Sequence, residues 1–148
     1  MREVEMPTQE DLNTLHDAEL AALSIDRANE SLDIVLVRVD GLRIGLKFGG
    51  VKVFRSSSLL FQNVVYSAAL SSLGHLARAD VKRVVAMACT LDGEQRLEGE
   101  PARFKATTIS SLVDKIIDGS LLMFQVEASW GAEIVVIGEA IAWYQPAA

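Results

Sequence analysis

The chain has 148 residues, half of which are hydrophobic, with a formal net charge of −6 and a sequence pI of about 4.9. This size and apolar content indicate one domain, residues 1–148, that can bury a core without metals or disulfides. The acidic balance argues against nucleic acid as a partner, because a phosphate-binding surface would have to form against the overall field.

Cysteine usage and the amino terminus indicate a cytoplasmic protein. Residues 1–11 are acidic and are not followed by an apolar run, unlike a secretory signal peptide. No apolar stretch reaches the roughly 18–20 residues of a membrane-spanning helix, so we expect no membrane association. Cys89 has apolar neighbours and no second cysteine to pair with, which predicts a buried thiol in a reducing compartment.

The amino-terminal part of the chain predicts a loose tail and then three strands. Residues 1–12 have little to bury, so we expect the fold to start near Leu15. Residues 19–27 alternate between apolar and polar, which predicts a strand with one face exposed to solvent. Residues 32–39 are apolar at both odd and even positions, which predicts a central strand covered on both faces. Asp40-Gly41 predicts a two-residue type I′ turn, because that turn needs positive φ at both central positions, and residues 42–48 form the next arm.

The middle of the chain is less regular. After Gly49-Gly50 the sheet either turns or kinks through a bulge before residues 51–54. Residues 59–73 fit a helix and a strand equally well. Residues 76–88 have apolar side chains at helical spacing and predict a helix, whereas residues 91–101 have the composition of an exposed loop.

The carboxyl-terminal part predicts a helix and a hairpin. Residues 107–118 have helical periodicity, Thr107 or Thr108 can cap the start of this helix, and Gly119 can end it. Its expected buried stripe consists of Ile109, Leu112, Val113, Ile116 and Ile117. Residues 122–130 and 133–144 form a hairpin, whose second arm is apolar on both parities and so lies inside a sheet or under a partner. The expected fold is α+β, with a mainly antiparallel curved sheet, an amino-terminal meander plus a carboxyl-terminal hairpin, packed against two or three helices.

Residue types that carry chemistry are few. His16 and Asp17 are adjacent, and in an extended segment they project to opposite sides, so we expect them to satisfy backbone groups at the start of the first strand and not to form a dyad. The two histidines and one cysteine lack zinc-like spacing, and the acidic residues 92–100 do not match a calcium loop, so we expect no metal. Neither a phosphate-binding glycine loop nor a hydrolase nucleophile motif is present, so we expect no cofactor and no catalytic residues.

Three further positions carry polar or aromatic groups that could bind a ligand or a partner. Gln62 and Asn63 precede two valines, and their amides could satisfy a strand edge or face a ligand; we favour the structural role. Trp130 could contribute to an interaction surface, although aromatic residues more often lie in a core or at a rim.

A short pattern in residues 15–65 resembles a known group of proteins. It consists of Leu15-His16-Asp17-Ala18, Asp40-Gly41, Phe48-Gly49-Gly50-Val51 and Gln62-Asn63-Val64-Val65. It resembles small uncharacterised bacterial proteins with an amino-terminal LHDA or LHDS signature, some of which resemble immunity proteins of polymorphic toxin systems. The resemblance implies a compact cytoplasmic bacterial protein with a curved sheet and no established catalytic residues.

These observations favour a non-enzymatic protein that binds another protein or itself, as a homodimer that would bury surplus apolar surface. The alternative is a small-ligand-binding protein with a pocket between sheet and helices and Gln62, Asn63 or Trp130 at its mouth. A hydrolase or isomerase is the third hypothesis.

Overall fold

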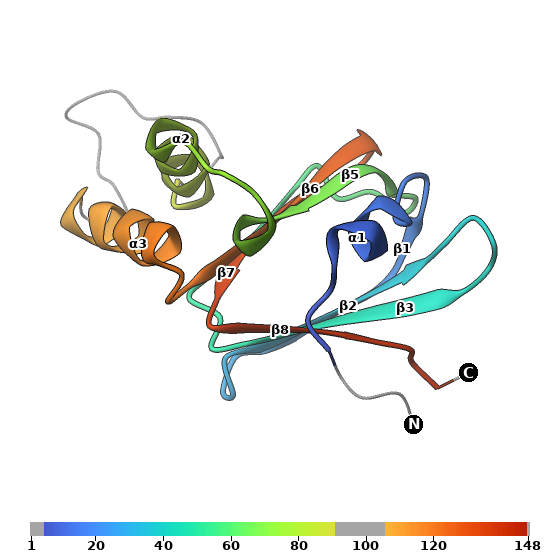
Figure 1. The fold of residues 1–148 in the computed structure, drawn as a ribbon. Coiled ribbons are helices and arrows are strands. Elements are labelled where there is room, and N and C mark those ends of the chain that lie inside the picture. Colours follow the sequence, from blue (N-terminus) through green and yellow to red (C-terminus); the bar gives the residue numbers. More distant parts are fainter. Residues whose placement is uncertain (1–4, 91–105, 148) are drawn as a thin grey trace.

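A computed structural model describes residues 5–90 and 106–147, and these residues form one curved, antiparallel sheet with three α-helices (Figure 1). The α+β prediction is confirmed. The helices are α1 (Gln9–Asn13), α2 (Arg78–Ala88) and α3 (Ala106–Asp118), and a short 3₁₀ helix, η1, spans Ser71–Leu73. The strands are β1 (Glu19–Asp26), β2 (Ser31–Val37), β3 (Arg43–Gly49), β4 (Val53–Ser57), β5 (Val64–Leu70), β6 (Leu122–Trp130), β7 (Glu133–Gly138) and β8 (Ala140–Tyr144).

The sheet has the strand order β4-β7-β6-β5-β1-β2-β3-β8 and does not close into a barrel. Its first half consists of β1, β2, β3 and β8, and its second half of β4 to β7. The halves pair with each other in the middle of the sheet, where Glu19 of β1 lies opposite Val64 of β5. Two segments also pass from one half to the other, because β3 runs into β4 and β7 runs into β8. Gly50, with φ of 58°, allows the first of these bends.

The inner core fills the space between the two halves. Phe48 of β3 and Phe124 of β6 meet there with their ring centroids 5.3 Å apart. Leu12 and Leu15, from α1 and the turn after it, are completely buried in the same cluster. One apolar core therefore joins the two halves. Each large apolar side chain that is fully buried there contributes about 1.5–3 kcal/mol to stability.

The outer core lies between the second half of the sheet and the helices α2 and α3 (Figure 1). Val135 and Ile137 of β7 face this cluster, whereas Ile134 and Val136 face the inner core. This arrangement explains why residues 134–137 are apolar on both parities. The strand lies inside the sheet, and α2 and α3 of the same chain cover its outer face.

The amino terminus differs from the prediction, since the expected loose tail of residues 1–12 contains helix α1. A capping box begins this helix: Thr8 Oγ1 accepts from the Asp11 amide at 3.1 Å, and Asp11 Oδ2 accepts from the Thr8 amide at 2.9 Å. The carbonyl of Glu5 also accepts from the Trp143 amide at 2.7 Å. Leu12 is buried, although the acidic composition of this segment gave no indication of burial.

Most of the other expected elements are present, with corrections at their ends. Residues 64–70 form a strand, which decides the alternative left open for residues 59–73. The Asp40-Gly41 turn is a three-residue loop, because Gly41 donates to the Arg38 carbonyl and Asp40 lacks the positive φ of a type I′ turn. Gly119 has the expected positive φ, whereas Ile117 is 45% exposed and lies outside the buried stripe of α3.

The start of α3 also differs, because the helix begins at Ala106, so Thr107 and Thr108 lie within it and do not cap it. The loop expected over residues 91–101 falls outside the described residues.

Candidate functional site

An exposed apolar cluster lies where the β4–β5 loop meets the β6–β7 turn. We call it the apolar tip, and it consists of Leu59, Leu60, Phe61 and Trp130. Phe61 is fully exposed, with a relative accessibility of 107%, and the other three are 50–60% exposed. Contiguous exposed apolar side chains of this kind mark interaction surfaces on soluble proteins, whereas single ones carry no such meaning.

The side chain of Asn63 fixes the backbone of the loop at the apolar tip. This side chain is buried, with 5% exposure, and its Oδ1 accepts hydrogen bonds from the backbone amides of Leu60 at 3.0 Å and Ala132 at 2.9 Å. Its Nδ2 donates to the Leu60 carbonyl at 2.7 Å. Gly131 makes this close approach possible, since a Cβ at that position would overlap the Asn63 carboxamide. The amide therefore has the structural role that the sequence favours.

The surroundings of the tip are acidic. Segments 3–26, 56–77 and 116–148 contain no lysine or arginine, and they include the tip and the strands β1, β5, β6 and β7; the adjoining strand β4 carries one cation, Arg55. Glu19, which accepts from Gln62 Nε2 at 3.1 Å, and Glu133, which follows the tip at the start of β7, are both exposed. A partner of this surface would therefore meet apolar groups beside uncompensated carboxylates.

His16 and Asp17 lie beside β5 and not at the tip. Their side chains come within 3.7 Å (Nε2 to Oδ2), because residues 14–17 form a turn with Asp17 at a φ of 64°. The expectation that they project to opposite sides is therefore wrong, since it assumed an extended backbone. His16 Nδ1 bonds the Tyr66 carbonyl at 2.7 Å, and the two rings pack edge to face.

The His16–Asp17 pair is poorly suited to catalysis. Both side chains are more than half exposed, so solvent screens their interaction. The adjoining hollow of about 330 Å³ is lined by His16, Tyr66 and mostly apolar or amide neighbours. His16 does bond a backbone group, but this group is the Tyr66 carbonyl of β5 and not a group at the start of β1, where the sequence placed it.

The positions singled out in the sequence thus separate into two groups. Gln62, Asn63 and Trp130 lie together at the tip, while His16 and Asp17 lie farther along β5. Leu59, Leu60 and Phe61 were not predicted as site residues, although three consecutive apolar residues between polar serines and amides are themselves a signal.

A pocket between the sheet and α2 is present, but its lining excludes Gln62, Asn63 and Trp130, so their expected place at its mouth is wrong. Cys89 lines this pocket and is buried as expected, and its burial raises the pKa of the thiol. A neutral thiol is a weak nucleophile.

The described residues contain neither a cluster of metal-ligating side chains nor a membrane-spanning helix. Across residues 5–90 and 106–147, no three histidine, cysteine or carboxylate side chains gather as metal ligands would. Among the helices described, none combines the length and apolarity required to span a bilayer. A search among known protein families, curated proteins and solved structures finds no match to the chain.

Proposed function

We propose that this chain is a non-enzymatic cytoplasmic protein-interaction module that binds a protein partner through the apolar tip. The observation that carries the proposal is the complete exposure of Phe61 beside three other exposed apolar side chains. Burying a phenylalanine contributes about 1.5–3 kcal/mol, and aromatic residues dominate the energetics of interfaces. A partner that covers the tip would gain this free energy.

The rigidity of the tip supports the same proposal. Asn63 fixes the loop and the neighbouring turn before any partner arrives, with three hydrogen bonds of 2.7–3.0 Å. A preformed surface avoids part of the ordering cost that association otherwise carries. The tip is therefore suited to act as an anchor.

The negative charge around the tip favours binding of a different protein over binding of a second copy of this chain. In a symmetric dimer through the tip, Glu19 and Glu133 of each copy would face the same carboxylates of the other, and like charges disfavour association. The apolar strand β7, one reason to expect a homodimer, is already covered by α2 and α3. We infer a partner with an apolar pocket rimmed by lysine or arginine.

The resemblance of residues 15–65 to immunity proteins supports this class of function, because an immunity protein acts by binding another protein. Gln62 and Asn63 belong to that resemblance and follow Phe61 directly in the sequence. The bacterial and immunity-like character of the chain forms part of this proposal.

The test is a comparison of Phe61→Ser with Ile117→Ser, which removes an exposed apolar side chain from α3. Each tagged protein is used to isolate partners from host lysate, and the partner is then purified and titrated by calorimetry. We expect at least a tenfold loss of affinity for Phe61→Ser and an unchanged affinity for Ile117→Ser. Equal affinities would remove the tip from the interface.

Two further measurements separate the alternatives. Light scattering coupled to size exclusion should give the mass of a monomer; a dimer that Phe61→Ser dissociates would instead establish self-association. Charge reversal by Glu133→Lys should slow association with a basic partner and weaken its salt dependence. An unchanged salt dependence would contradict the inferred basic rim.

A further inference from the structure

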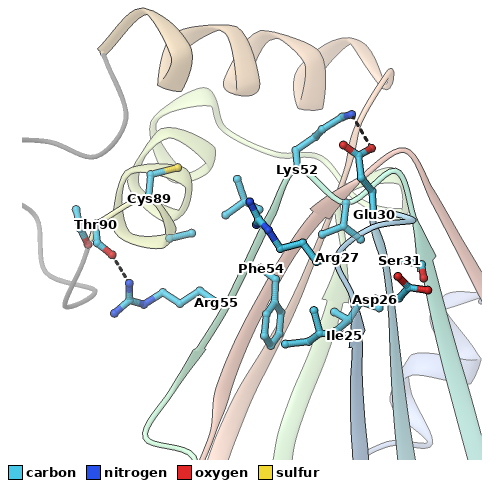
Figure 2. Close-up of a pocket in the computed structure, with 14 residues that line it drawn as sticks. Ile25, Asp26, Arg27, Glu30, Ser31, Lys52, Phe54, Arg55, Cys89 and Thr90 are labelled. Carbon is cyan, nitrogen blue, oxygen red and sulfur yellow. Dashed lines mark hydrogen bonds and ion pairs between the residues drawn. The ribbon is translucent and has the colours of Figure 1, made fainter.

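The pocket between the β1–β2 turn, strand β4 and the end of α2 has a volume of about 680 Å³ (Figure 2). A backbone hydrogen bond joins two sides of the pocket, since the Val51 amide donates to the Glu30 carbonyl at 2.8 Å. Three cationic side chains line it: Arg27 from the turn, Lys52 from the bend before β4, and Arg55 from β4. None of its lining residues belongs to the apolar tip.

The charged side chains that line the pocket differ in whether they have a charged partner. Lys52 lies 3.5 Å from Glu30 and 3.4 Å from Glu139, measured between Nζ and a carboxylate oxygen. The charge of Glu30, followed by the hydrogen bond and charge of Glu139, raises the pKa of Lys52. Asp26 accepts two hydrogen bonds from Asn29, at 3.1 and 2.8 Å. Lys52 and Glu30 thus form an ion pair, whereas Asp26 has, among the described residues, only the uncharged Asn29 as partner and leaves one negative charge against the two arginines of the pocket.

The two arginines differ from Lys52. Arg55 donates to the Thr90 carbonyl and, at 3.1 Å, to Ser57 Oγ, and both of these acceptors are uncharged. Arg27 forms no ion pair with any residue in the described part of the chain. In Figure 2 its side chain extends from the turn into the space between Phe54 and Lys52. Two guanidinium groups therefore share one concavity without a described carboxylate partner.

These two arginines concentrate positive charge locally in a chain with a net charge of −6. A concave site concentrates the local positive potential, and the guanidinium fork matches the geometry of a carboxylate or phosphate. The pocket is also partly apolar, because Ile25 is 62% exposed on one side and Phe54 is half-buried on another. Its volume is typical of small-molecule sites and far larger than an inorganic anion requires.

We propose that this pocket binds a small organic anion. Arg27 binds its carboxylate or phosphate group beside Ile25 and Phe54, which contact its apolar part, and Arg55 adds positive charge on the α2 side of the pocket. This site is independent of the apolar tip, so either proposal can fail without the other.

The test uses phenyl phosphate and benzoate as anionic probes and benzyl alcohol as a neutral probe of similar size. Binding is followed by chemical-shift changes of backbone amides at 50 mM salt. We expect saturable shifts at the β1–β2 turn and β4 with at least one anionic probe, and none with benzyl alcohol. Shifts with no probe, or equal shifts with benzyl alcohol, would overturn the proposal.

The matched variants are Arg27→Gln in the pocket and Arg43→Gln, which removes an exposed arginine from β3 outside it. Arg27→Gln should weaken binding of the anionic probe at least tenfold, and Arg43→Gln should leave it unchanged. Equal weakening by both variants would show non-specific attraction and contradict the site. Because Arg55 also holds Thr90, it is tested as Arg55→Lys, which keeps the positive charge and should leave binding of the anionic probe unchanged.

Discussion

The side-chain oxygen of Asn63 accepts a hydrogen bond from the backbone amide of Ala132 at 2.9 Å, across 69 residues of sequence. The same oxygen accepts from the Leu60 amide. One buried side chain thus joins the β4–β5 loop to the β6–β7 turn, and the position of Phe61 depends on it.

Replacing Asn63 with alanine should destabilise the protein by about 2–3 kcal/mol, because the buried Ala132 amide and the Leu60 amide lose their acceptor. The free energy of unfolding, measured with urea, checks this. Gln62→Ala is the control, since Gln62 is exposed and bonds only Glu19 among its described neighbours; its effect should stay within about 0.5 kcal/mol. Equal losses for the two variants would contradict the structural role of Asn63.

Gly131→Ala should be more destabilising than Gly119→Ala. Both glycines have positive φ, 81° and 86°, so each variant should lose about 1–2 kcal/mol to backbone strain. Only at Gly131 would the new Cβ also overlap Asn63 and lie 2.9 Å from the Gln62 carbonyl, whereas nothing lies within 4 Å at Gly119. Thermal unfolding of the two variants measures the difference, and a smaller loss for Gly131→Ala would argue against this close approach.

Phe124→Ala should lower the free energy of unfolding by about 3–5 kcal/mol, because it opens a cavity between the halves of the sheet. Phe124 is 1% exposed and packs on Phe48. Phe61→Ala is the comparison. Because Phe61 is exposed, this variant should change the free energy of unfolding by no more than about 0.5 kcal/mol. Chemical denaturation distinguishes them; a small effect at Phe124 would mean that the halves do not share a core.

Acid should weaken the β1–β2 turn through Asp26. The side-chain hydrogen bond from Asn29, followed by its backbone bond, lowers the pKa of Asp26 below its usual 3.8. Ionised Asp26 therefore stabilises the fold above pH 3.8, and this contribution is lost as the pH falls through 3.8 to the lower value of the folded state. Titration of its carboxyl carbon by NMR should give a pKa below 3.8, and Asn29→Ala should raise it. An unchanged pKa in Asn29→Ala would contradict this cause.

Several elements could be predicted from the sequence because their signals are local. The alternation in β3 and the apolar spacing in α2 and α3 depend only on which face of each element is buried. The two-sided apolar pattern of residues 134–137 also indicated burial on both faces correctly. It did not indicate that α2 and α3 of the same chain provide the outer cover, because that is a contact between distant segments.

Other features depend on distant contacts. Residues 64–70 form a strand because β1 and β6 offer backbone partners on either side, which outweighs an ambiguous local pattern. The capping box at Thr8 and Asp11 was a readable local signal that the acidic composition obscured. His16 and Asp17 approach each other because the chain turns at Asp17, which a strand-based interpretation excluded.

By itself, the sequence determined the α+β class, most of the strands and two of the helices, because amphipathic periodicity and glycine positions act over a few residues. Only the tertiary structure decided where functional groups gather. Phe61 and Trp130 come from segments about seventy residues apart, and Arg27 and Arg55 from two separate elements. Long-range strand pairing, together with the buried Asn63 amide at the tip, sets these positions, and no local pattern encodes them.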